Sequence, residues 1–232
     1  MAPESSGPES GSAATGLAAT PVWDPYVRIF HWLLVIGLAG SWITGENEWY
    51  DTHYQIGLCV GGLVIFRILW GFVGSPTARF SHFIKGPGAV FTYMKTMLAR
   101  KPSHAFGHNA GGGLMVLILL LAVGLQAFTG LFNTDDVLFD GPLYDNAPEW
   151  FTKFAGAWHA RLFNILLVLV VLHVLVIALY FFWKRENLVR AMVTGRAFLP
   201  KGNGEAKFAS PFRAVIVAAI AAVPPILVYV LN

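Results

Sequence analysis

Five of the seven histidines lie in or beside strongly apolar stretches of the chain, where an ionisable side chain is costly and usually functional. They are His31, His53, His108, His159 and His173. Imidazole can bind a metal, carry a proton or form a hydrogen bond to a redox cofactor. In a helix, the spacing of His159 and His173 puts both on one side, about 21 Å apart along the axis. His82 and His104 fall in a more polar segment and are interpreted as surface residues.

Five long apolar runs must position these histidines. Each is close to the roughly 20 residues that a helix needs to cross the hydrocarbon core of a membrane. None alternates in the way a membrane β-strand does, so the sequence predicts an all-α integral membrane protein. Pro224 and Pro225 are expected to kink or break the last helix. The runs are Ile29–Thr44, Gln55–Val73, Leu114–Phe132, Ala160–Trp183 and Phe212–Leu231.

The segments between the runs differ strongly in charge. The first and third connecting segments are acidic, and the second and fourth are basic; of the sixteen Lys and Arg residues, only Lys153 and Arg161 fall on the acidic side. Because basic loops remain in the cytoplasm, we expect a cytoplasmic N-terminus and, if the fifth run spans, an external C-terminus. Residues 86–101 are interpreted either as an amphipathic helix on the inner surface or as a plain connecting helix.

This topology sorts four histidines into two pairs at matching depths. His31 and His173 belong to the inner half, whereas His53 and His159 lie near the outer surface. Two histidines facing each other across a bundle suit bis-imidazole ligation of a haem iron. Zinc and copper normally require further ligands, with cysteine or carboxylate among them. A proton relay would also require carboxylates, and the first four runs have none in their apolar parts.

Three arginines and the remaining histidine are candidates for binding the cofactor periphery. Arg67 and Arg28 can pair with a propionate of the inner haem, although Arg67 can equally extend to the inner headgroups. Arg161 can serve the outer haem. His108 has no partner at its depth, so we expect it to form a hydrogen bond to a propionate or to a bound quinone. Three glycines can admit a flat ring or pack against another helix: Gly57, Gly61 and Gly62.

Composition excludes several protein classes. The 232-residue chain is 56% hydrophobic and 12% charged, with a net charge of +3, which argues against an ordinary soluble domain and a nucleic-acid partner. Its single cysteine, Cys59, excludes an internal disulfide and a cysteine-rich metal cluster. Without a Cys-x-x-Cys-His motif, any haem is held by ligation alone. Residues 1–21 lack the basic and apolar regions of a signal peptide and are predicted to form a disordered cytoplasmic tail.

Several short motifs together resemble a known family. They are VWDPYVRIFHW (22–32), FRILWGFVG (66–74), GHN (107–109), TGLFNTDD (129–136), GPL (141–143) and WKRENLVRAMVTGR (183–196). This pattern resembles bacterial cytochrome b561 proteins, which are related to the cytochrome b subunit of nickel-iron hydrogenases. The resemblance implies a four-helix membrane domain over residues 22–196 that holds two b haems and exchanges electrons with quinone. The ligand positions of the family correspond to His31, His53, His159 and His173. Residues 197–232 lie outside it and are predicted to form a linker and an extra membrane helix.

The expected function is therefore electron transfer across a bacterial inner membrane, between the quinone pool and a periplasmic redox partner. The acidic outer segment 135–149 can dock a basic partner such as a c-type cytochrome, or a hydrogenase-like enzyme, or it can simply be a solvated loop. Two other functions fit the same residues. One is a haem-binding membrane anchor subunit with a structural role, and the other is a histidine-lined transporter. The sequence leaves open whether the chain is a simple electron carrier or a subunit of a quinone oxidoreductase.

Overall fold

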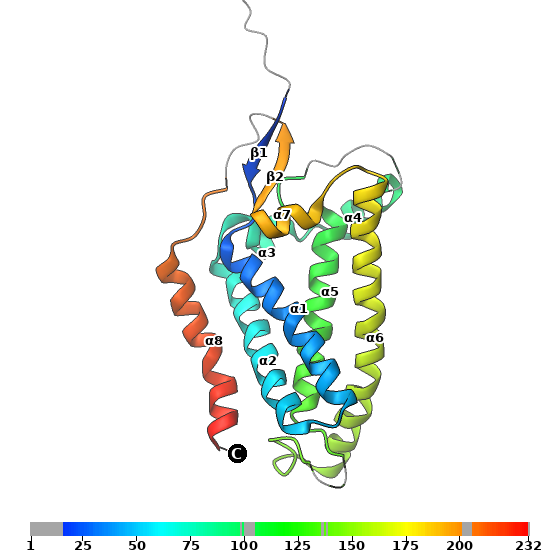
Figure 1. The fold of residues 1–232 in the computed structure, drawn as a ribbon, viewed down its shortest axis with the longest axis vertical. Coiled ribbons are helices and arrows are strands. Elements are labelled where there is room, and N and C mark those ends of the chain that lie inside the picture. Colours follow the sequence, from blue (N-terminus) through cyan, green and yellow to red (C-terminus); the bar gives the residue numbers. More distant parts are fainter. Residues whose placement is uncertain are drawn as a thin grey trace, which may run out of the picture.

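All five apolar runs form helices in the computed structural model, which describes residues 16–97, 99, 105–135, 137, 139–200 and 206–231 (Figure 1). By length and composition, each of these helices can cross a membrane. The protein is therefore a multi-pass helical membrane protein, as its sequence predicts. The five helices are α1 (Pro25–Glu46), α2 (Tyr50–Val73), α5 (Ala110–Gly130), α6 (Glu149–Phe182) and α8 (Pro211–Leu231).

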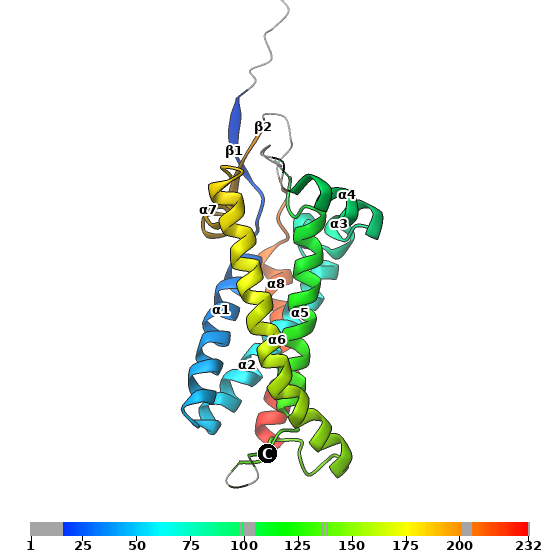
Figure 2. The ribbon, with the colours of Figure 1, turned by 90° about the vertical axis from the view of Figure 1, so that its right-hand side faces the viewer.

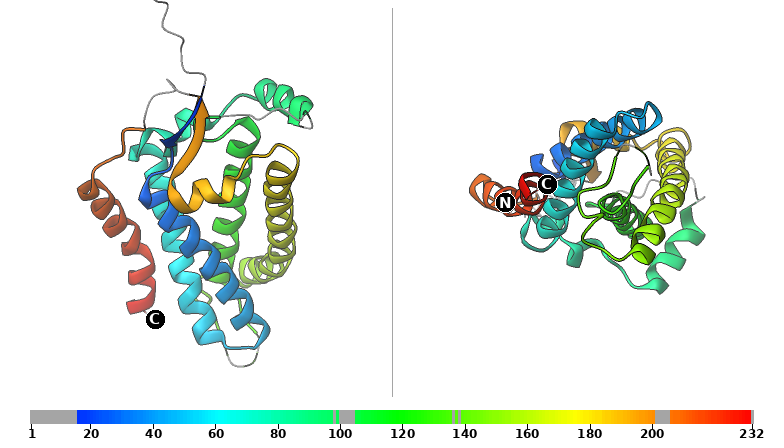
Figure 3. Two further views of the ribbon diagram at one scale, coloured as in Figure 1. Left: turned by 45° about the horizontal axis from the view of Figure 1, so that its top comes forward. Right: turned by 90° about the horizontal axis from the view of Figure 1, so that it is seen from below.

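Two helical hairpins form a four-helix bundle. Helix α1 packs along α2, α5 packs along α6, and the hairpins join where α2 meets α5. The centre of this bundle includes Val60 and Val64 of α2, Val123 of α5 and Leu166 of α6. Helices α1 and α6 are not among the closely packed pairs of the described residues. Helix α8 lies outside the bundle against α2, as Figures 1 and 3 show, and it is seen behind the other helices in Figure 2.

The short elements all gather at one end of the bundle (Figure 1). We call it the basic end; it holds η1 (Pro76–Ala78), α3 (Phe80–Phe83), α4 (Pro87–Met97), α7 (Leu188–Thr194) and the ribbon of β1 (Leu17–Pro21) and β2 (Arg196–Pro200). The opposite, acidic end holds the turn between α1 and α2, the described residues between α5 and α6, and the last turn of α8. This arrangement matches the alternation of basic and acidic segments in the sequence. The helix expected within residues 86–101 is α4.

The ribbon corrects the prediction for the N-terminal tail. Residues 17–21 form β1, which pairs antiparallel with β2 from Leu17 opposite Pro200 to Pro21 opposite Arg196. The backbone hydrogen bonds of β2 order a segment whose composition alone indicates disorder. Residues 1–15 of the predicted tail lie outside the described residues. The ribbon therefore joins the two segments that flank the bundle.

Helix α8 answers part of a second expectation, that Pro224 and Pro225 kink or break the last helix. The helix continues through both prolines to Leu231, so it is not broken there. Proline is tolerated inside membrane helices when neighbouring helices support the local backbone. Here Pro225 lies against α2, because a Cβ added to Gly62 would meet its Cγ at 3.3 Å.

Helix α1 begins at a fully buried carboxylate. Asp24 caps the helix by accepting a 2.7 Å hydrogen bond from the backbone N–H of Val27, and Pro25 occupies the first turn. Its other oxygen accepts a 3.1 Å hydrogen bond from Nε1 of Trp70 on α2. Asp24 therefore fixes the start of α1 against α2, two turns before His31.

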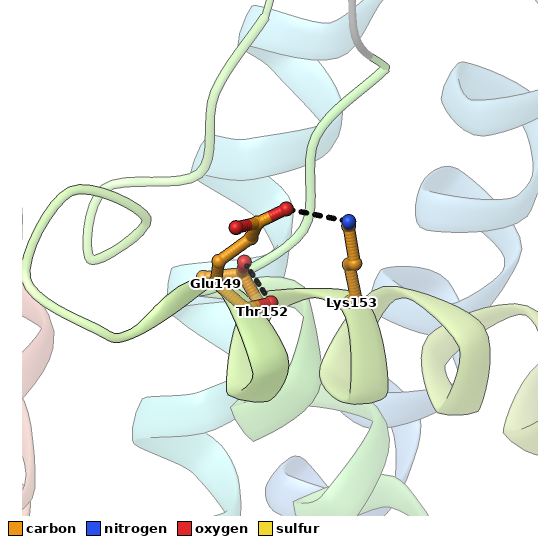
Figure 4. A network of polar contacts seen from close by, with 3 residues as sticks. All are labelled: Glu149, Thr152 and Lys153. Atoms are coloured by element: carbon orange, nitrogen blue, oxygen red, sulfur yellow. Dashed lines mark hydrogen bonds and ion pairs between the residues drawn. The ribbon is translucent and has the colours of Figure 1, made fainter.

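Helix α6 begins at the acidic end with a surface ion pair. Glu149 and Lys153, one turn apart, are joined at 2.5 Å, and the hydroxyl of Thr152 donates to the carbonyl of Glu149 at 3.0 Å (Figure 4). Both charged side chains are exposed, so the pair contributes little to stability. It marks the first turn of the helix that carries His159 and His173.

Candidate functional site

The structure brings His53 and His159 together at the acidic end. Their ring centres lie 6.1 Å apart, with the planes at 82°. Nδ1 of His53 donates to the carbonyl of Ser41 at 2.8 Å, and Nδ1 of His159 donates to the carbonyl of Gln126 at 3.0 Å. Both rings are thus held as the tautomer whose Nε2 carries the lone pair, the form that binds a metal. In His159 this nitrogen lies 3.2 Å from the side-chain amide nitrogen of Gln126, which an iron would displace. The spacing suits one metal atom bonded to both rings at about 2 Å.

His31 and His173 form the second predicted pair, nearer the basic end. His31 belongs to α1 and His173 to α6, and the two imidazoles are close enough to interact electrostatically. Nδ1 of His31 is buried without a hydrogen-bond partner in the described part of the chain. A buried unpaired polar atom is unusual in a native protein and indicates a missing partner or ligand.

Arg67 and His108 lie next to each other at the basic end. The guanidinium of Arg67 is 2% exposed and lies 5.4 Å from the ring centre of Phe80 and 5.8 Å from that of Phe83. The ring of His108 lies 4.8 Å from that of Phe83 and 4.5 Å from that of Trp23. Nη1 of Arg67 and Nδ1 of His108 are both buried without a partner among the described residues. Together they offer polar nitrogens to a ligand rich in hydrogen-bond acceptors.

His108 precedes the membrane helix α5 and is neutral at physiological pH. Burial, together with the charges of Arg67, His82 and His173, lowers the pKa of its imidazole to about 3. A neutral imidazole can both donate and accept a hydrogen bond. His108 can therefore bind a neutral polar ligand without changing its charge.

Arg28 and Arg161, the other two predicted arginines, differ in placement. Arg28 lies at the basic end, where its Nη1 donates to the carbonyl of Val193 in α7 at 2.6 Å and its buried Nε has no partner among the described residues. Arg161 is exposed; it donates to the carbonyl of Ala157 at 3.3 Å and lies 5.9 Å from the ring of Trp158. Two residues along a helix correspond to about 200°, so Arg161 points away from the face that carries His159. The structure does not bring Arg161 to the histidine pair.

Of the two histidines interpreted as surface residues, His82 needs a correction. His82 is half-buried: its ring lies 6.5 Å from Phe106, a Cβ at Gly107 would meet it at 3.5 Å, and its Nδ1 is buried without a partner in the described chain. It therefore belongs to the surroundings of His108. His104 lies outside the described residues.

The three glycines of α2 have different neighbours. A Cβ at Gly62 would contact Pro225 of α8, and one at Gly61 would lie 4.0 Å from Ala127 of α5. Both therefore serve helix packing. Only Gly57 has no neighbour within 4 Å of that position, so it alone leaves space for a ring.

The close pair of His53 and His159 between membrane helices is an arrangement that suits a haem-binding helical membrane protein. The family comparison agrees. Residues 22–195 match the family model of prokaryotic cytochrome b561, and the chain belongs to this family. It is therefore a membrane protein of a family that transfers electrons through haem b. No curated protein and no solved structure gave a match.

Proposed function

We propose that the chain holds two b haems, one between His53 and His159 and one between His31 and His173, and passes electrons between a quinone and a redox partner across the membrane. The geometry of His53 and His159 carries this proposal, because their ring centres lie 6.1 Å apart, which suits one iron, and the hydrogen bonds of Nδ1 leave Nε2 as the nitrogen with the lone pair. The haem supplies reversible one-electron chemistry when bound. The chain supplies ligands, orientation and charge.

Arg67 and Arg28 suit the carboxylates of the haem at the basic end. Each has a buried guanidinium nitrogen without a partner among the described residues. An arginine in an apolar surrounding is stable only when its charge is compensated. Asp24 acts electrostatically on Arg67 but already uses its two oxygens for Val27 and Trp70. A propionate group would supply the remaining compensation.

His108 suits the quinone. Its neutral imidazole can donate to a quinone carbonyl or accept from a quinol hydroxyl. Trp23 and Phe83 flank the imidazole and provide apolar surface for a flat ring. We therefore place the quinone at the basic end, near His108 and Arg67.

The basic end faces the cytoplasm of a bacterial inner membrane in this proposal, because basic segments remain on that side. The acidic end then faces the periplasm. Its carboxylates, such as Asp140 and Asp145, favour a basic partner such as a c-type cytochrome, or a hydrogenase-like enzyme.

Haem stoichiometry tests the proposal directly. The purified full chain is expected to contain two b haems per polypeptide, both reducible and both lost on denaturation because no thioether bond holds them. The measurements are the haem-to-protein ratio and the reduced-minus-oxidised spectrum. A colourless protein after expression with ample haem would refute the proposal and favour a histidine-lined transporter. Two haems that no quinol can reduce would favour a structural anchor subunit.

The role of His108 predicts a specific pH dependence. His108→Leu is expected to slow haem reduction by quinol about tenfold, the effect of losing one hydrogen bond of about 1.4 kcal/mol. Because the pKa of His108 is lowered to about 3, its imidazole stays neutral from pH 5 to 8. The ratio of the wild-type rate to the variant rate should therefore be constant over that range. A ratio that falls with acidification around pH 6.5 would contradict the assignment.

A further inference from the structure

The ring of His53 sits in a small cradle at the end of α1. Its Nδ1 donates to the carbonyl of Ser41 at 2.8 Å and lies 3.5 Å from the hydroxyl of Thr44. The hydroxyl of Thr44 itself donates to the carbonyl of Gly40 at 2.7 Å, so its oxygen is fixed. A Cβ at Gly45 would come within 3.2 Å of the same Nδ1. The carbonyl fixes the tautomer, the threonine flanks it, and the glycine lets the ring approach.

The ring of His159 sits in a matching cradle at the end of α5. Its Nδ1 donates to the carbonyl of Gln126 at 3.0 Å and lies 3.3 Å from the hydroxyl of Thr129, which donates to the carbonyl of Leu125 at 2.8 Å. A Cβ at Gly130 would meet the ring at 2.9 Å. The carbonyl, the threonine and the glycine have the same spacing in both helices. The two cradles are SWITG (41–45) and QAFTG (126–130).

The amide of Gln126 adds to the second cradle. Its Nε2 lies 3.2 Å from Nε2 of His159, and its Oε1 is buried without a partner in the described part of the chain. An amide nitrogen can only donate, so Nε2 of His159 must be the accepting nitrogen. This contact independently supports the tautomer that the backbone carbonyl sets.

The basic-end pair lacks an equivalent cradle at its α1 member. Nδ1 of His31 is buried, yet it has no hydrogen-bond partner among the described residues. His31 lies two turns inside α1, where helix carbonyls are not at a terminus. His31 therefore differs from His53 and His159 in having no such hydrogen bond behind its ring among the described residues.

This difference has an electronic consequence. An Nδ1–H that donates to a carbonyl makes the imidazole a stronger ligand, and carbonyls near the negative end of a helix dipole strengthen the effect. A stronger ligand stabilises the oxidised iron, because that state carries the larger positive charge. We propose that the two cradles keep the reduction potential of the His53/His159 site below that of the His31/His173 site, with Thr44 and Thr129 as positioning residues. This inference rests on the proposed di-haem function.

Redox titration of the purified full chain tests the inference through Thr129→Val, which removes the hydroxyl and keeps the shape. The lower of the two midpoint potentials is expected to rise by up to about 59 mV, which corresponds to a tenfold change in the equilibrium constant of a one-electron step. The higher potential should not change. Thr129→Ser keeps the hydroxyl and should restore the wild-type value. The control is Thr152→Val, which removes a buried hydroxyl at the start of α6, away from both threonines. It should change neither potential.

Three results would overturn the inference. They are an unchanged lower potential in Thr129→Val, an equal shift in Thr152→Val, or a retained lower potential in His159→Ala. If Thr129→Val does not fold, Thr44→Val makes the same measurement through His53. A wild-type protein with fewer than two haems would instead refute the proposed function itself, which separates the two failures.

Discussion

Replacing His159 with alanine is expected to remove one of two haems and to leave the other with its wild-type spectrum. The methyl side chain of alanine cannot bind iron. Among the described histidines, His53 is the one whose ring contacts that of His159, at 6.1 Å between the ring centres. His53→Ala should therefore cause the same loss. The measurement is the haem-to-protein ratio together with the reduced-minus-oxidised spectrum of each variant.

Double variants make the pairing test sharper. If His53 and His159 bind one haem, as proposed, the double alanine variant should lose no more haem than either single variant. His31→Ala combined with His159→Ala should lose both haems. His82→Ala removes a half-buried histidine outside both pairs and should retain two. Complete haem loss in the His53/His159 double variant of a folded protein would show that the pairs are drawn wrongly.

Replacing Asp24 with alanine is expected to give the largest loss of stability. Asp24 is fully buried and serves both as the cap of α1 and as the acceptor for Trp70. Loss of a cap costs about 1 kcal/mol, and a buried N–H left without an acceptor costs about 1–3 kcal/mol. We expect a lower thermal unfolding temperature and preferential loss of the haem bound by His31, whose helix start would fray.

Two variants provide controls for this prediction. Asp24→Asn keeps an oxygen that can cap the helix, because asparagine caps about as well as aspartate, so its loss should be smaller. Asp51→Ala removes an exposed carboxylate from the first turn of α2 and should stay within about 0.5 kcal/mol of wild type. Equal stability of the Asp24→Ala and Asp51→Ala variants would show that the buried carboxylate does not hold α1.

The membrane helices could be predicted from the sequence because their apolar length is a local property. Charge asymmetry then ordered the histidines by depth, and the predicted proximity of His53 and His159 is confirmed by the structure. Their ligation of haem, like that of His31 and His173, stays a prediction. The ribbon was missed because β1 pairs with a segment at the other end of the chain, and no local pattern specifies such a partner.

Side-chain direction limited the prediction of the site. The sequence predicts that Arg161 serves the outer haem, but a step of two residues from His159 turns its side chain to the other face of the helix. His82 was judged by the polarity of its segment, whereas the fold buries it beside Gly107. The threonines and glycines of the cradles are ordinary helix-end residues in the sequence. Their shared role, which is to hold an imidazole ring, follows only from the contacts that the fold makes between them and the two histidines. The repeat of Thr-Gly at 44–45 and 129–130 was the one signal available.

The pairing of β1 with β2 has a consequence for biosynthesis. A growing polypeptide exposes β1 first, but β2 emerges only after α6 and α7 have been made. Until then, the backbone groups of residues 17–21 must be hydrated by water, and the ribbon cannot close. Closure then brings the start of the chain to the segment that leads into α8. The ribbon thus forms as a late assembly step, and a translation product that stops after α7 would leave β1 unpaired.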